Sequence, residues 1–186
     1  MNVAAIVIIV IVILIVVAIA GWALSQRRRS GDLRQRFGPE YERTVAQTWD
    51  QGRAESVLEQ RVKRVEKLDV HPLSATDYAR FSEAWRSVQS KFVDDPAAAV
   101  TQADRLIGEV MQTRGYPVGD FEQRAADISV EHPRVVENYR AAHEVAQRSV
   151  DGQASTEDLR KATIAYRSLF QELVEASESK QTEVQR

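Results

Sequence analysis

An uncharged stretch at the start of the chain constrains the fold more than any other feature. Val3 to Leu24 (VAAIVIIVIVILIVVAIAGWAL) contains no Asp, Glu, Lys or Arg. As a helix rising about 1.5 Å per residue, this run is roughly 33 Å long, enough to cross a hydrocarbon core of about 30 Å. A lone strand would leave its backbone groups unpaired in lipid. The sequence therefore predicts a transmembrane anchor over residues 1–24.

A cleaved signal peptide is the alternative interpretation of the same run. Residues 18–20 (AIA) have the small-x-small form of a cleavage site. However, the first two residues carry no basic side chain, and the apolar run continues past that site through Trp22. It is also longer than the usual apolar region of a signal, which has about 7–15 residues. The anchor is favoured, and an exported or periplasmic envelope protein stays open as the alternative.

A basic segment follows the uncharged run directly. Residues 25–37 hold one acid, Asp32, and five arginines. The arginines are Arg27, Arg28, Arg29, Arg34 and Arg36. Basic residues beside a span stay on the cytoplasmic side and attract anionic lipid headgroups. We therefore predict a basic juxtamembrane linker over 25–37. Its arginines and Trp22 lie at the membrane interface, with the N-terminus outside and the C-terminal domain in the cytoplasm.

The charge balance of the remaining chain argues against nucleic acid as a partner. The whole chain has 25 basic and 27 acidic side chains. Five of the basic ones and one of the acidic ones lie in 25–37, so 20 basic and 26 acidic side chains remain in 38–186. Binding to phosphate backbones depends on clustered Lys and Arg, which an acidic body does not favour. The chain also has no cysteine. This excludes disulfides, thiolate catalysis and cysteine-ligated metals.

Apolar residues recur at intervals of three and four through 38–176, which is typical of amphipathic helices. The first predicted helix begins at Pro39, carries Trp49 on its apolar side and ends before Pro72. The second begins at Ser74, a cap residue. Its inward stripe comprises Tyr78, Phe81, Trp85, Val88 and Phe92.

Further caps divide the second half of the body. Asp95 precedes a helix that ends at Gly115, Asp120 precedes a short helix, and two more helices begin at Pro133 and near Ser155. Short connections favour antiparallel neighbours. We predict an all-α fold, in which an N-terminal transmembrane helix precedes an antiparallel bundle of four main helices plus one short helix. The bundle domain covers 38–176, and a polar, flexible tail covers 177–186.

Known catalytic and metal-binding patterns are missing from the sequence. The residues three positions before His71, His132 and His143 are not glutamates, so the Glu-x-x-His pattern of carboxylate-bridged metal bundles does not occur. Phosphate-binding glycine loops and a Gly-x-Ser-x-Gly turn do not occur either. We predict no metal, no cofactor and no enzymatic activity. A membrane-bound enzyme with a site between helices stays open, since catalytic groups can come from distant positions.

The irregular segment 113–134 holds the candidate partner-binding residues. Tyr116, Pro117 and Phe121 lie in or beside a turn flanked by Gly115 and Gly119. Aromatic residues on a rigid turn are favourable contact residues for another protein. We therefore predict that they contribute to binding a protein partner. The alternative is that the two rings close the end of the bundle.

Three stretches carry a resemblance. RFGPEYERTV (36–45), RGYPVGDFEQRAADISVEHPRVVENYR (114–140) and TEDLRKA (156–162) resemble a family of uncharacterised bacterial proteins with one N-terminal transmembrane span and a helical cytoplasmic domain. The resemblance implies this architecture and a bacterial inner membrane, and it provides no catalytic residues. We expect a membrane-anchored, non-enzymatic interaction or scaffold module.

Overall fold

The structure is a computed structural model that describes residues 3–117 and 119–184. Among them, the side chains of residues 3–10, 12, 22–24, 26 and 175–184 lie outside the description. Every regular element in the described residues is an α-helix, which confirms the predicted all-helical class. The helices are α1 (Val3–Phe37), α2 (Pro39–Thr48), α3 (Gln51–Val65), α4 (Ala75–Asp94), α5 (Pro96–Thr113), α6 (Phe121–Glu131), α7 (Pro133–Val150) and α8 (Thr156–Val184).

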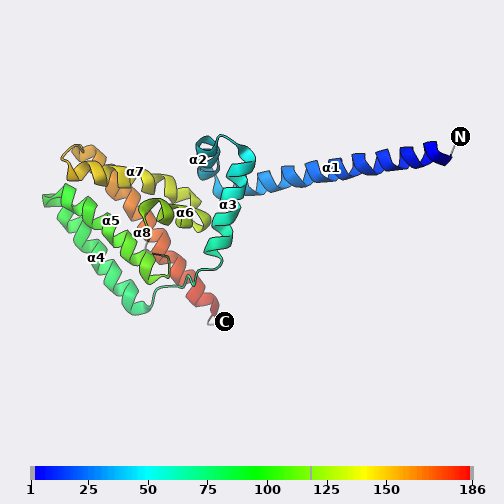
Figure 1. Ribbon diagram of the computed structural model, residues 1–186. Helices are drawn as coiled ribbons and strands as arrows, with labels where there is room; N and C mark the ends of the chain where they lie inside the picture. The colour runs from blue at the N-terminus through cyan, green and yellow to red at the C-terminus, as the bar shows by residue number, and fades with distance from the viewer. Residues whose placement is uncertain (1–2, 118, 185–186) are drawn as a thin grey trace.

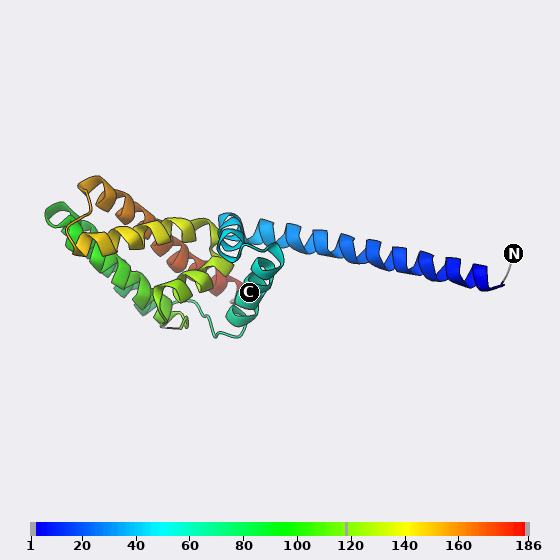
Figure 2. The same cartoon turned by 45° about the horizontal axis from the view of Figure 1, so that its top comes forward.

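The first helix is long and projects from the rest of the molecule. α1 extends away as a single rod, and the other described helices gather around its C-terminal end (Figure 1; Figure 2). Residues 25–37, predicted as a linker, are part of this helix. Its last turns pack against the body, because Leu33 is 8% exposed and Phe37 is fully buried.

The bundle is formed by α4, α5, α7 and α8, with the shorter α6 packed on α7. α4 and α5 form one antiparallel pair, and α7 and α8 form another (Figure 1). The predicted stripe of α4 lies mostly inside this core. Trp85 stacks on Phe170 of α8 with ring centroids 5.0 Å apart. Tyr78, on the first turn of α4, is 38% exposed instead, so its predicted place in the core is wrong.

Side-chain caps define the starts of these helices as the sequence predicts. In each case an oxygen of the cap residue accepts a hydrogen bond from the backbone N–H three residues later. The pairs are Ser74 with Asp77 at 3.0 Å, Asp95 with Ala98 at 3.0 Å, Asp120 with Gln123 at 2.8 Å and Ser155 with Asp158 at 3.2 Å.

The predicted single helix from Pro39 to just before Pro72 is wrong, because the chain breaks at Trp49 and α3 ends at Val65. This residue adopts a left-handed conformation with φ of 55°, and its side chain is 92% exposed rather than in the core. The physical reason lies in the next residue. Asp50 accepts a hydrogen bond from the backbone N–H of Arg53 at 2.6 Å and so caps a new helix, α3.

α1, α2 and α3 enclose a second apolar core beside the bundle. It comprises Leu33, Phe37, Tyr41, Leu58 and Val65, together with Val130 of α6. The connector 66–74 leads from α3 to the bundle, and its His71 N–H donates to the Arg114 carbonyl at 2.9 Å. The body therefore has two cores, one at the end of α1 and one within the bundle.

Candidate functional site

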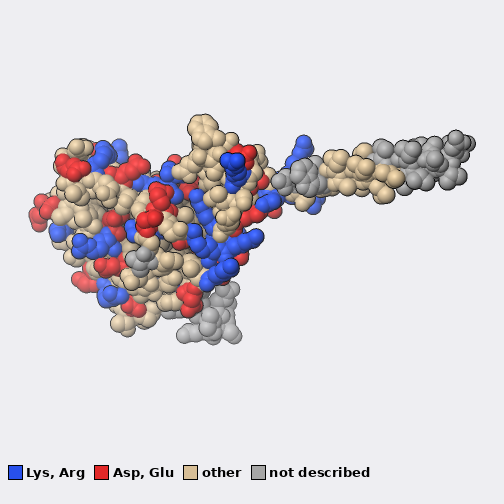
Figure 3. Space-filling model, viewed as in Figure 1, with Lys and Arg blue, Asp and Glu red and all other residues tan. Residues whose placement is uncertain are grey.

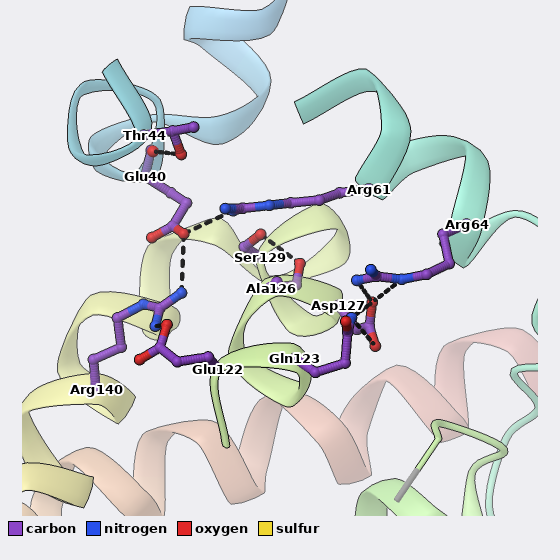
Figure 4. Close-up of polar contacts among 10 residues, drawn as sticks. All are labelled: Glu40, Thr44, Arg61, Arg64, Glu122, Gln123, Ala126, Asp127, Ser129 and Arg140. Carbon is purple, nitrogen blue, oxygen red and sulfur yellow. Dashed lines mark hydrogen bonds and ion pairs between the residues drawn. The ribbon is translucent and has the colours of Figure 1, made fainter. Parts of the chain in front are cut away.

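Arginine and carboxylate side chains from four helices meet between the two cores (Figure 4). We call this set the junction network. It comprises Glu40 of α2, Arg61 and Arg64 of α3, Glu122 and Asp127 of α6, and Arg140 of α7. Glu40 is 2% exposed and Asp127 is 1% exposed, which is rare for carboxylates unless they are paired.

Glu40 joins α2 to both neighbouring parts of the molecule. Its Oε1 accepts from Arg61 Nη1 at 2.8 Å and from Arg140 Nη2 at 3.1 Å. Arg140 also donates to Glu122 through Nη1. Arg140 thus bridges one buried carboxylate and one exposed carboxylate with a side chain that is itself only 6% exposed.

Asp127 forms the second centre of the network. Its Oδ1 accepts from Nε of Arg64 at 2.9 Å and also from Nη2 of the same guanidinium, and Gln123 Nε2 lies 3.2 Å from both carboxylate oxygens. Local spacing orients these groups. Arg61 and Arg64 are three residues apart on α3, and Gln123 and Asp127 are four apart on α6, so each pair lies on one helix face.

The chemistry available to the junction network is that of a fixed ionic contact. Three guanidinium groups face three carboxylates, and each carboxylate of the network contacts an arginine. Arginine stays protonated in proteins and cannot act as a base. Removing one partner of a buried ion pair strongly destabilises the fold, because the other charge is left buried without a partner. The network therefore sets how α2 and α3 sit on α6 and α7.

A second polar cluster lies within the bundle around Asp104. Its Oδ1 accepts from the Tyr166 hydroxyl at 2.9 Å and from His143 Nδ1 at 3.1 Å. Burial alone would raise the pKa of Asp104, but the hydrogen bond and charge of His143 and the hydroxyl of Tyr166 lower it overall. Burial beside this carboxylate raises the pKa of Tyr166. The cluster joins α5, α7 and α8.

The three predicted partner-binding residues differ in their exposure to solvent. Tyr116 is 2% exposed and its hydroxyl donates to Glu131 at 2.6 Å. Phe121 is half-buried and stacks on His143 with ring centroids 3.6 Å apart, whereas Pro117 is exposed. For Tyr116, the structure agrees with the alternative interpretation, in which its ring closes the end of the bundle.

Backbone geometry explains why Tyr116 is buried. Gly115 has φ of 94°, and the Tyr116 N–H bonds back to the Met111 carbonyl at 3.0 Å, which folds the chain over the end of α5. A Cβ at position 115 would lie 2.2 Å from the Asp69 carbonyl oxygen. The turn is therefore pressed against the connector, and the tyrosine enters the core.

The five arginines predicted at the membrane interface are all exposed, and two of them also form ion pairs. Arg29 pairs with Glu59 of α3, and Arg34 lies 3.2 Å from Glu42 of α2. The side chain of the sixth predicted interface residue, Trp22, lies outside the described residues.

Comparison with protein-family models, curated proteins and solved structures gives no match. Within the part of the chain that the structure describes, no group of three or more His, Asp or Glu side chains is arranged to hold a metal ion. In the same described residues, no helix is long and apolar enough to cross a membrane.

Proposed function

We propose that the chain is a membrane-anchored, non-enzymatic interaction or scaffold module, with its N-terminus outside a bacterial inner membrane and its helical body in the cytoplasm. The uncharged run Val3 to Leu24 supplies the anchor, and the arginines after it favour the cytoplasmic side.

The observation that carries the proposal is the continuity of α1. The helix continues from Leu24 to Phe37, 13 residues further, which corresponds to roughly 20 Å. Phe37 is fully buried in the body, and Arg29 and Arg34 pair with carboxylates of α3 and α2. A helix without a flexible break holds the body at a set distance from the bilayer, as a scaffold requires.

Basic side chains directly after the uncharged run support contact with anionic headgroups. On the face in Figure 3, a further group of Lys and Arg lies over α3 and the C-terminal end of α1, and Asp and Glu are spread over the rest of the body. Arg27 and Arg28 are exposed close to the end of the uncharged run. Each basic residue near an anionic surface contributes about 1 kcal/mol of attraction.

Trp49 is the residue that best fits contact with a protein partner. It combines 92% exposure with a left-handed backbone that costs roughly 1–2 kcal/mol for an L-residue. Residues held in a strained backbone conformation cluster at functional sites, and tryptophan is enriched among the residues that dominate binding. We therefore propose Trp49 for this contact, with Pro117 and the half-buried Phe121 as secondary candidates.

The test of the anchor compares the full chain with a version lacking residues 1–24. The full chain should stay in the pellet when bacterial membranes are washed at alkaline pH, and the shortened chain should be recovered in the supernatant. A full chain that is released by the wash, or that is found shortened near residue 20, would favour the cleaved-signal alternative. Affinity capture with the full chain and its Trp49→Ala variant then tests the partner surface.

A further inference from the structure

The two apolar cores of the molecule are formed by different buried side chains. Among the described residues, the core at the end of α1 takes one buried side chain from the bundle, Val130 of α6. The buried core of the bundle begins at Leu73 and includes no residue of α1, α2 or α3 in the described part of the chain. The half-buried Leu68 of the connector packs against both cores. Each part therefore holds an apolar interior of its own.

Ion pairs supply the polar part of the contact between the two parts, beside the apolar contact of Val130. Glu40 with Arg140 joins α2 to α7, and Arg64 with Asp127 joins α3 to α6. Such pairs contribute little compared with apolar contacts of the same size while both partners are present, because desolvation offsets the attraction. They nevertheless hold α2 and α3 in one position on α6 and α7. A partial shift would leave buried charges without partners, which is strongly unfavourable.

Hollows lie along the same boundary. One of about 330 Å³ lies between α3 and α6–α7, one of about 210 Å³ between α2 and α7, and one of about 380 Å³ between the end of α1 and the α6–α7 corner. A larger hollow, of about 620 Å³, lies within the bundle between α4 and α5, and the boundary hollows differ from it in their lining. Arg140 of the junction network lines two of them, so solvent comes close to the network.

We propose that this boundary is a separable joint. When the junction network is broken, the part formed by α1–α3 comes away from the part formed by α4–α8, which stays folded. α2 and α3, with 10 and 15 residues, lose Val130 from their core and open in the same step, because helices this short are marginal without packing. The two parts then stay connected through residues 66–74. The bundle changes its position relative to α1, and the faces of α6 and α7 that carry Asp127 and Arg140 become accessible. The inference goes beyond the proposed function and does not require the membrane.

Hydrogen exchange of the full chain in detergent micelles tests the joint without any substitution. At low denaturant concentration, amides of α2 and α3 should exchange through an opening that leaves α5 and α8 protected. If all four helices open together at the same free energy, the body is one cooperative unit and the proposal is wrong.

A variant with Glu40→Gln and Asp127→Asn gives the second test. Removing one partner of a buried ion pair is strongly destabilising, so protection in α2 and α3 should fall by about a hundredfold or more. Protection in α5 and α8 should stay unchanged. The matched control is Glu83→Gln with Glu157→Gln. It removes three exposed pairs, with Arg86, Arg160 and Lys161, and should leave all four helices as they were.

Spin labels provide an independent readout, because the chain has no cysteine and introduced thiols are the only ones. Labels at Gln47→Cys on α2 and Ser90→Cys on α4 should give one narrow distance in the parent chain and an added, broader population in the Glu40→Gln, Asp127→Asn variant. Labels at Ser90→Cys and Arg167→Cys, both in the bundle, should stay narrow in both. Unchanged distances across the joint, or broadening of both label pairs, would overturn the proposal.

Discussion

Two tryptophans in the same body offer a direct test of where its core lies. Trp85 is 6% exposed and stacks on Phe170, whereas Trp49 is 92% exposed. Burial of an aromatic side chain removes about 150–250 Å² from water, and apolar burial contributes about 25 cal/mol per Å². Trp85→Ala should therefore lower the free energy of unfolding by about 3–5 kcal/mol, as large-to-small core changes do.

The matched change at the exposed position should behave in the opposite way. Trp49→Ala removes little buried area, so it should change the free energy of unfolding by less than about 0.5 kcal/mol. The assay is urea unfolding of the full chain in detergent micelles, followed by circular dichroism. A loss below about 1 kcal/mol for Trp85→Ala would refute the placement of this ring in the bundle core. A loss above about 2 kcal/mol for Trp49→Ala would refute its exposure.

Further predictions concern the polar cluster and the turn at the end of α5. The pKa of Asp104 is lower in the folded state than in the unfolded chain, where it is about 4. The ionised Asp104 side chain therefore stabilises the fold above about pH 4, and this stabilisation is lost as the pH falls further. Asp104→Asn should cost about 1.5–3 kcal/mol at pH 7 and flatten the acid limb of a stability–pH curve; an unchanged limb would contradict the hydrogen bonds to His143 and Tyr166. Gly115→Ala should cost about 1–3 kcal/mol from backbone conformation alone, measured by denaturant unfolding. Gly108 lies within α5, and a Cβ added there would meet open space, so Gly108→Ala should raise the free energy of unfolding by about 0.5–1 kcal/mol. Equal effects of the two glycine substitutions would contradict the account of the turn.

Features determined by neighbouring residues could be predicted from the sequence. Ser74, Asp95 and Asp120 cap helices because each side chain reaches a backbone N–H three residues away. The break at Trp49 follows the same chemistry. Its spacing from Tyr41 and Val45 suits a helix, but the Asp50 cap competes with that helix and prevails.

Features determined by distant residues could not be predicted in this way. Glu40 and Arg140 are 100 positions apart, and Arg64 and Asp127 are 63 apart. A charged residue on a helix is usually solvated, so the sequence contained no signal that these would be buried together. Tyr116 shows the same limit, because its burial depends on how Gly115 meets the connector at Asp69.

The central claim, an anchored chain with its body in the cytoplasm, is tested most directly by thiol accessibility. Because the chain has no cysteine, Asn2→Cys and Ser90→Cys each introduce a single thiol. A membrane-impermeant maleimide should label Asn2→Cys in spheroplasts with intact inner membranes, and Ser90→Cys only after detergent is added. Labelling of Ser90→Cys before the membrane is opened, in a chain that remains membrane-bound, would place the body outside and contradict the account.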